Sequence, residues 1–176
     1  MAIKMPTKEE MRRALIRRTV EPLLEAVAGG DAPASTWLQL GLAQVKAEQL
    51  REATRSFREA LSRDPALVPA RMNLAVALFH LGDYEAAAAE NRTLLETSPN
   101  LLAARSNLGM ALYLLGRYEE CVGEMERVLR VEPKHPVALA ALSRSHHALG
   151  RENEAKKYER LAVEAGVRFA SPAEAS

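Results

Sequence analysis

The sequence has very little of several features that usually identify a class of protein. It holds one cysteine among 176 residues, which excludes an internal disulfide and indicates a reducing compartment. No stretch approaches the ~18 uninterrupted apolar residues of a membrane span. The first residues contain no apolar run like the core of a signal peptide. We therefore expect a cytoplasmic protein without a membrane span.

The sequence also lacks a large excess of charge of either sign and is poor in aromatic residues. Lys and Arg number 24 against 23 Asp and Glu, so no global basic field points to a nucleic-acid partner. Aromatic residues make up 5% of the chain, whereas Ala, Leu, Arg and Glu are abundant. These abundant side chains lose little rotamer freedom on a helical backbone, so the composition favours an all-α fold.

An internal repeat with a constant step of 34 residues runs through most of the chain. Three sets of residues recur at this step: Pro65, Pro99 and Pro133; Gly82, Gly116 and Gly150; and Leu40, Leu74, Leu108 and Leu142. Apolar residues within a unit recur at steps of three and four, as in Ala53, Phe57 and Ala60, which is the helical period. A glycine in the left-handed conformation can end the first helix of a unit, and a proline ends the second because it cannot continue a helix. Each unit therefore predicts two helices joined by a turn.

With these residues in place, the chain resembles the tetratricopeptide repeat (TPR) family. The family pattern is Trp, Leu, Gly, Tyr, Ala, Phe, Ala, Pro, and the first copy reads Trp37, Leu40, Gly41, Gln44, Ala53, Phe57, Ala60, Pro65. The resemblance implies an all-α, right-handed superhelix of about four helix pairs, at 34–67, 68–101, 102–135 and 136–167. A flexible tail is expected over residues 168–176.

The segment before the first repeat, 1–33, does not follow the repeat pattern. Thr7 and Glu10 have the spacing of a capping box, which predicts a helix that starts near Lys8. Thr19 is expected to cap a second helix with Pro22 in its first turn. Three interpretations of this N-terminal helical extension are open: a cap on the first repeat, a dimerisation arm, or a segment that fills the binding groove.

The resemblance also implies where a partner binds, because the first helix of each pair lines the inside of such a superhelix. The residues that this register assigns to the concave groove, together with two neighbouring asparagines, are Leu38, Leu42, Val45, Met72, Asn73, Val76, Phe79, Ser106, Asn107, Met110, Tyr113, Arg144 and His147. Most of them are apolar. They suit a peptide or an amphipathic helix of another protein.

No arrangement of residues predicts catalysis. His146 and His147 are sequence neighbours that point to different sides of one helix, so they cannot share a metal as an i, i+4 pair does. Cys121 occupies a small-residue packing position and is interpreted as a buried, inert thiol. We expect no enzyme activity, no metal and no cofactor.

Two functions remain open at this stage. The first is a protein–protein interaction scaffold or adaptor that binds a peptide or helix of a partner in the apolar groove. The second is a dedicated chaperone, similar to the secretion chaperones of this family, which holds an apolar client segment and forms a homodimer through residues 1–33.

Overall fold

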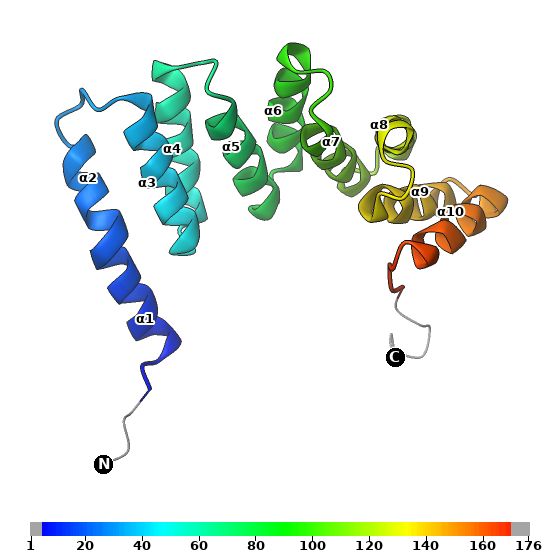
Figure 1. Cartoon of the computed structure of the whole chain (residues 1–176), viewed down its shortest axis with the longest axis horizontal. Coiled ribbons are helices and arrows are strands. Elements are labelled where there is room, and N and C mark those ends of the chain that lie inside the picture. Colours follow the sequence, from blue (N-terminus) through cyan, green and yellow to red (C-terminus); the bar gives the residue numbers. More distant parts are fainter. Residues whose placement is uncertain (1–4, 170–176) are drawn as a thin grey trace. The chain divides into compact units, whose positions relative to one another are not determined.

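The computed structural model describes residues 5–169, and every regular element in that range is helical (Figure 1). The chain divides into two compact units, Met1–Glu90 and Asn91–Ser176, with the boundary inside one helix. The flexible tail predicted for residues 168–176 lies, from residue 170 onward, outside the described residues.

The first unit begins with one continuous helical rod (Figure 1). It comprises α1 (Lys8–Leu15), a π-helical turn η1 (Ile16–Val20) and α2 (Glu21–Val27). The predicted capping box is confirmed. The Glu10 amide donates to Thr7 Oγ1 at 3.2 Å, and the Thr7 amide donates to Glu10 Oε2 at 2.7 Å. Two of the orphan amides of the first turn are thereby satisfied.

The prediction that Thr19 caps a second helix is wrong. Its hydroxyl donates instead to the Leu15 carbonyl at 2.8 Å, inside the rod. The Glu21 amide donates to the Ile16 carbonyl, which is the π-helical pattern. Because Pro22 lacks an N–H and its ring would press on the carbonyl one turn before it, the wider turn lets the rod continue into α2.

The rest of the first unit consists of α3 (Ala34–Lys46), α4 (Leu50–Arg63), α5 (Val68–His80) and the start of α6 (Tyr84–Thr97). Helix α3 packs on α4, α4 on α5, and α3 also touches α5. The core between them holds Phe57, Leu74 and Leu78, each at most 3% exposed. Burial of these side chains and the alanines around them holds the hairpins together.

The N-terminal rod lies against α3. Val20 and Val27 are buried in one cluster with Leu40. The Arg12 Nε donates to the carbonyl of Ala47, the residue that ends α3, at 2.9 Å. The rod therefore covers a face of α3 that would otherwise be open to solvent.

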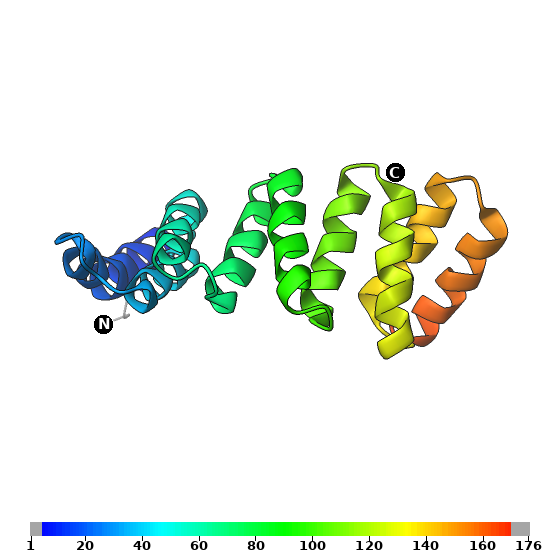
Figure 2. The same cartoon turned by 90° about the horizontal axis from the view of Figure 1, so that it is seen from above.

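The second unit holds the remainder of α6, followed by α7 (Leu102–Leu114), α8 (Tyr118–Val131), α9 (Pro136–Ala148) and α10 (Glu152–Glu164). Successive helices from α7 onward pack in chain order, and α7 also touches α9. Figure 2 shows α9 and α10 side by side at the end of this unit. Leu112, Met125 and Leu142 are buried in its interior.

The turns within the hairpins are closed by a left-handed residue, as predicted. Gly82, Gly116 and Gly150 have φ of 82°, 73° and 72°. In the first repeat Glu48 occupies the position that corresponds to Gly82, with a φ of 60°. A side chain in this conformation costs free energy that glycine does not incur.

An ion pair recurs with the repeat and was not predicted. Arg71 Nη1 lies 2.7 Å from Glu90 Oε2 in the first unit, and Arg105 Nη1 lies 2.7 Å from Glu124 Oε2 in the second. Each arginine also donates to the carbonyl of a repeat-ending proline, Pro65 or Pro99. These arginines stand where the first copy has Trp37, and they join the helices by hydrogen bonds instead of by an apolar ring.

Candidate functional site

The predicted binding residues of the first unit form a surface on α3 and α5, which we name the α3–α5 surface. It consists of Leu38, Leu42, Val45, Met72, Asn73, Val76 and Phe79. Leu42, Val45 and Val76 are 36%, 37% and 41% exposed. Three large aliphatic side chains on two touching helices thus remain accessible to solvent.

Leu38, Phe79 and Asn73 of the α3–α5 surface make contacts with the rest of the unit. Leu38 and Phe79 are partly buried and pack on the core of the unit. The Phe79 ring also meets the Tyr84 ring edge-on at 5.3 Å. Asn73 Nδ2 donates to the carbonyl of Pro69 at 2.7 Å, which fixes the amide to its own helix. Phe79 and Asn73 are therefore held by contacts within the unit, and the exposed aliphatic residues are the part of the surface that a partner can reach.

The predicted residues of the second unit lie on α7 and α9 and are named the α7–α9 surface. It consists of Ser106, Asn107, Met110, Tyr113, Arg144 and His147. Ser106 is buried at 8% exposure, so it contributes little to the surface. His147 is exposed, and its Nδ1 lies 3.0 Å from Glu152 Oε1. Met110, Tyr113 and Arg144 line one cavity.

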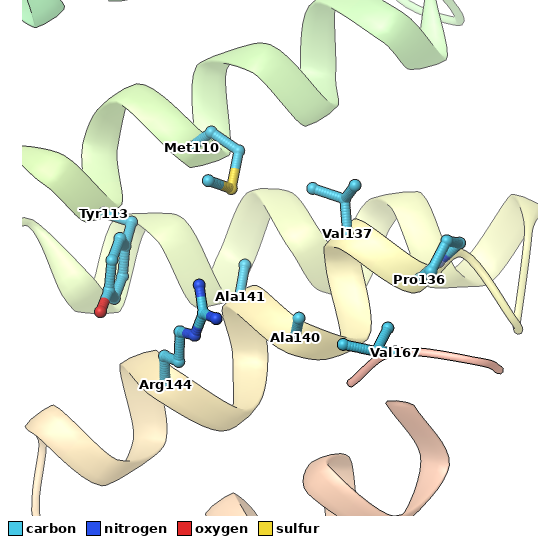
Figure 3. Close-up of a pocket in the computed structure, with 8 residues that line it drawn as sticks. All are labelled: Met110, Tyr113, Pro136, Val137, Ala140, Ala141, Arg144 and Val167. Carbon is cyan, nitrogen blue, oxygen red and sulfur yellow. The ribbon is translucent and has the colours of Figure 1, made fainter. Parts of the chain in front are cut away.

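This cavity has a volume of about 250 Å³ and lies between α7, α9 and the segment after α10 (Figure 3). Its lining is almost entirely apolar and comprises Met110, Tyr113, Pro136, Val137, Ala140, Ala141, Arg144 and Val167. Figure 3 shows Tyr113 and Arg144 toward one end and Pro136 and Val137 toward the other. An apolar pocket with a polar group at one end is the common form of a ligand site.

Sequence reasoning missed several of these lining residues, Ala140 and Val167 among them. Ala140 could have been found, because it occupies the same position in its repeat as Met72 and Ser106, which the register assigned to the inside. Val167 could not, since it follows the last helix and belongs to no repeat position. It reaches the pocket only because the chain turns back after Gly166, whose φ is 87°.

A second cavity of about 430 Å³ adjoins the first, sharing Tyr113 and Arg144 with it. The Arg144 guanidinium lies 5.9 Å from the centre of the Phe169 ring, a cation–π arrangement. The charged lining residues are Arg144, Glu152, Lys156 and Glu159, and His147 lies among them. Both signs of charge are present, so this second cavity favours neither an acidic nor a basic ligand.

The candidate catalytic groups are placed for packing. Cys121 is fully buried, and burial raises the pKa of its thiol, which keeps it protonated. His146 is buried and stacks on Tyr158, with ring centroids 5.4 Å apart. Within residues 5–169 no three His, Cys, Asp or Glu side chains are grouped as a metal site would need. None of the helices in that range is long and apolar enough to cross a membrane.

Comparison with known proteins agrees with the repeat pattern. Two family models, both described as tetratricopeptide repeat, match residues 38–101 and 102–127, which together are just over half of the chain. No curated protein matches the sequence.

Solved structures match over nearly the whole chain. A crystal structure of MamA has a TM-score of 0.80 at 18% identity and covers 93% of this chain and 96% of its own. A structure of MamA AMB-1 has a TM-score of 0.77 at 24% identity, with 93% of each chain covered. YrrB, described as a TPR protein with an unusual peptide-binding site, has a TM-score of 0.76 at 21% identity, covering 89% of this chain and 78% of its own. At these identities the likeness establishes the fold.

Proposed function

Because the chain belongs to the tetratricopeptide repeat family, we propose that it is a protein-interaction scaffold without catalytic activity of its own. In this proposal residues 34–167 form the repeat array and residues 1–33 cap it. The array holds a peptide or an amphipathic helix of another protein on the first helices of its repeats. One structural neighbour, YrrB, is described as a TPR protein with an unusual peptide-binding site, which gives peptide binding a precedent on the same fold.

The observation that carries the proposal is the accessible aliphatic part of the α3–α5 surface. Leu42, Val45 and Val76 lie on touching helices and are each at least a third exposed. Exposed single apolar residues are ordinary, but three that share the inner register of two touching helices favour a binding surface. An amphipathic helix would bury these side chains with its own apolar stripe.

Affinity capture from native lysate tests this proposal with Val76→Glu as the disrupting variant. A glutamate at this position would be buried by the partner without a compensating charge, so capture should fall by roughly tenfold or more. Val131→Glu, on α8 and 69% exposed, is the matched control and should capture like the wild type. Phe79→Glu is a poorer probe, because Phe79 packs on the core and its loss would also lower stability.

Circular dichroism of both variants checks that the helices persist. If Val76→Glu retains its helical content and still captures the same proteins as the wild type, the α3–α5 surface is not the binding surface. If no protein is captured reproducibly by any form of the chain, the scaffold proposal itself is wrong.

The second candidate function is a dimeric chaperone. One observation favours it: the N-terminal rod packs on α3 with its valines yet leaves Met11 and Leu24 52% and 45% exposed. Light scattering at several concentrations separates the two candidates. A dimer that Leu24→Glu converts to a monomer supports the chaperone, whereas a monomer at all concentrations supports the simple scaffold.

A further inference from the structure

The cavity between α7 and α9 carries one charged group on an otherwise apolar wall. Arg144 is exposed, lines this cavity and contacts the Phe169 ring. Within residues 5–169 it forms no ion pair, whereas Arg105 on α7 pairs with Glu124. A guanidinium beside an apolar pocket is therefore left to bind a carboxylate from outside the described chain.

The pocket beside it has the size of one large side chain. A cavity of about 150 Å³ holds a benzene ring in a protein core. The volume of about 250 Å³ here therefore accommodates a leucine, methionine or phenylalanine side chain with the backbone at the mouth. Met110, Val137 and Val167 supply aliphatic contacts, and Met110 can change rotamer to fit different shapes.

The spacing between pocket and guanidinium sets the spacing in the ligand. Val137 and Arg144 lie two turns apart on α9, which corresponds to about 10 Å along the helix axis. Figure 3 shows Ala140 and Ala141 between them. From the middle of the cavity to Arg144 is then about 5 Å along the axis, which is close to two residues of an extended peptide or one turn of a helix.

We propose that the α7–α9 pocket recognises a partner segment in which a large apolar side chain stands about two to four positions from an aspartate or glutamate. The apolar side chain fills the space between Met110, Val137 and Val167, and the carboxylate pairs with Arg144. This assignment rests on the proposed function and gives it a sequence preference. It depends on the second unit alone.

Selection of random peptides displayed on phage, against the full-length chain, tests the assignment without a known partner. Enriched peptides should share an apolar residue and an acidic residue at the stated spacing. For one such synthetic peptide, Arg144→Glu should weaken binding roughly ten- to a hundredfold, because a charge-assisted pair becomes a like-charge repulsion. Arg160→Glu, an exposed position on α10 away from the cavity, is the control and should bind normally.

Two further variants make the test specific. A peptide in which lysine replaces the acidic residue should bind Arg144→Glu better than it binds the wild type. Ala140→Leu should fill the cavity and weaken the original peptide while the helical content stays unchanged. If the enriched peptides lack the paired pattern, or bind Arg144→Glu as well as wild type but fail on Val76→Glu, this assignment is wrong and the scaffold function stands.

The same experiment would also identify a different occupant of the α7–α9 pocket. If no peptide is enriched until residues 170–176 are deleted, the chain's own tail, which contains Glu174, fills the pocket and the partner assignment fails. If peptide binding weakens as protein concentration rises, a second copy of the chain is the occupant and the assignment fails as well. If no peptide is enriched with either form, both this assignment and the scaffold function fail.

Discussion

The buried ring of Phe57 on α4 lies directly against Gly41 on α3. A methyl group added at Gly41 would come within 2.6 Å of Phe57 Cδ1 and 2.9 Å of Cζ. Such distances are far inside van der Waals contact, and Phe57 is fully buried, so its ring has little room to move. The close approach of α3 and α4 therefore depends on the absence of a side chain at Gly41.

Gly41→Ala should destabilise the protein by about 1–3 kcal/mol, the usual cost of overpacking, even though alanine is the better helix former by about 1 kcal/mol. Gly109→Ala is the matched comparison. There the added methyl meets Met125 Cε at 2.7 Å; Met125 is buried as fully as Phe57, but its unbranched side chain can change rotamer where a ring cannot. Its cost should stay within about 0.5 kcal/mol because the helix propensity offsets the strain. Urea denaturation compares the two, and equal losses would contradict this account.

Glu48→Gly should stabilise the protein by about 1 kcal/mol. Glu48 takes the left-handed conformation that glycine takes in the three later repeats. The change removes an ion pair with Lys8, but both side chains are well exposed, so that pair contributes little. The reverse substitution, Gly116→Ala, should destabilise by a similar amount. A lower thermal midpoint for Glu48→Gly would show that the Lys8 contact matters more than the backbone strain.

The sequence predicted the helices well because the constant stride repeats every signal: packing residues, turn glycines and terminal prolines. Gly41 occupies the glycine position of the repeat pattern and Gly109 lies two repeats later at the same position, but their close contacts with Phe57 and Met125 come from the structure. The recurring Arg71–Glu90 and Arg105–Glu124 pairs stand at one fixed spacing in the sequence, but spacing alone does not show that side chains on two different helices meet.

The features that escaped prediction depend on single events outside the repeat. Pro22 lies in the first turn of α2, as predicted, but the π-helical turn before it joins α1 and α2 into one rod that was not predicted. The apolar cavity needs Val167, which a non-repetitive segment brings back onto α9. Periodicity reports which face of a helix is buried, but it carries no information on how a unique segment returns to the array.

Acid should weaken the protein through His146. Burial lowers the pKa of this imidazole, and the nearby Arg151 lowers it further. As the pH falls below about 6.5, the unfolded chain binds a proton that the folded His146 resists, so stability is complete above that pH and declines below it. His146→Leu should flatten this decline between about pH 7 and pH 5.5, measured as the urea midpoint. His147→Leu, at an exposed position, should leave the decline in place; the opposite pattern would assign the effect to His147.

The Arg105–Glu124 pair should stabilise the second unit far more than a surface ion pair does. The two side chains are only 17% and 15% exposed, and Arg105 also donates to the Pro99 carbonyl at 2.6 Å. Arg105→Ala leaves a partly buried carboxylate and a carbonyl without this donor, at a cost of about 1–3 kcal/mol. Arg13→Ala breaks a pair with Glu9 whose side chains are 75% and 56% exposed, and should change stability by less than about 0.5 kcal/mol. Added salt should leave the difference between the two variants nearly unchanged, because the partly buried pair is poorly screened. If the two substitutions cost the same, the recurring arginine fills only the space of the Trp37 position and its charge contributes nothing.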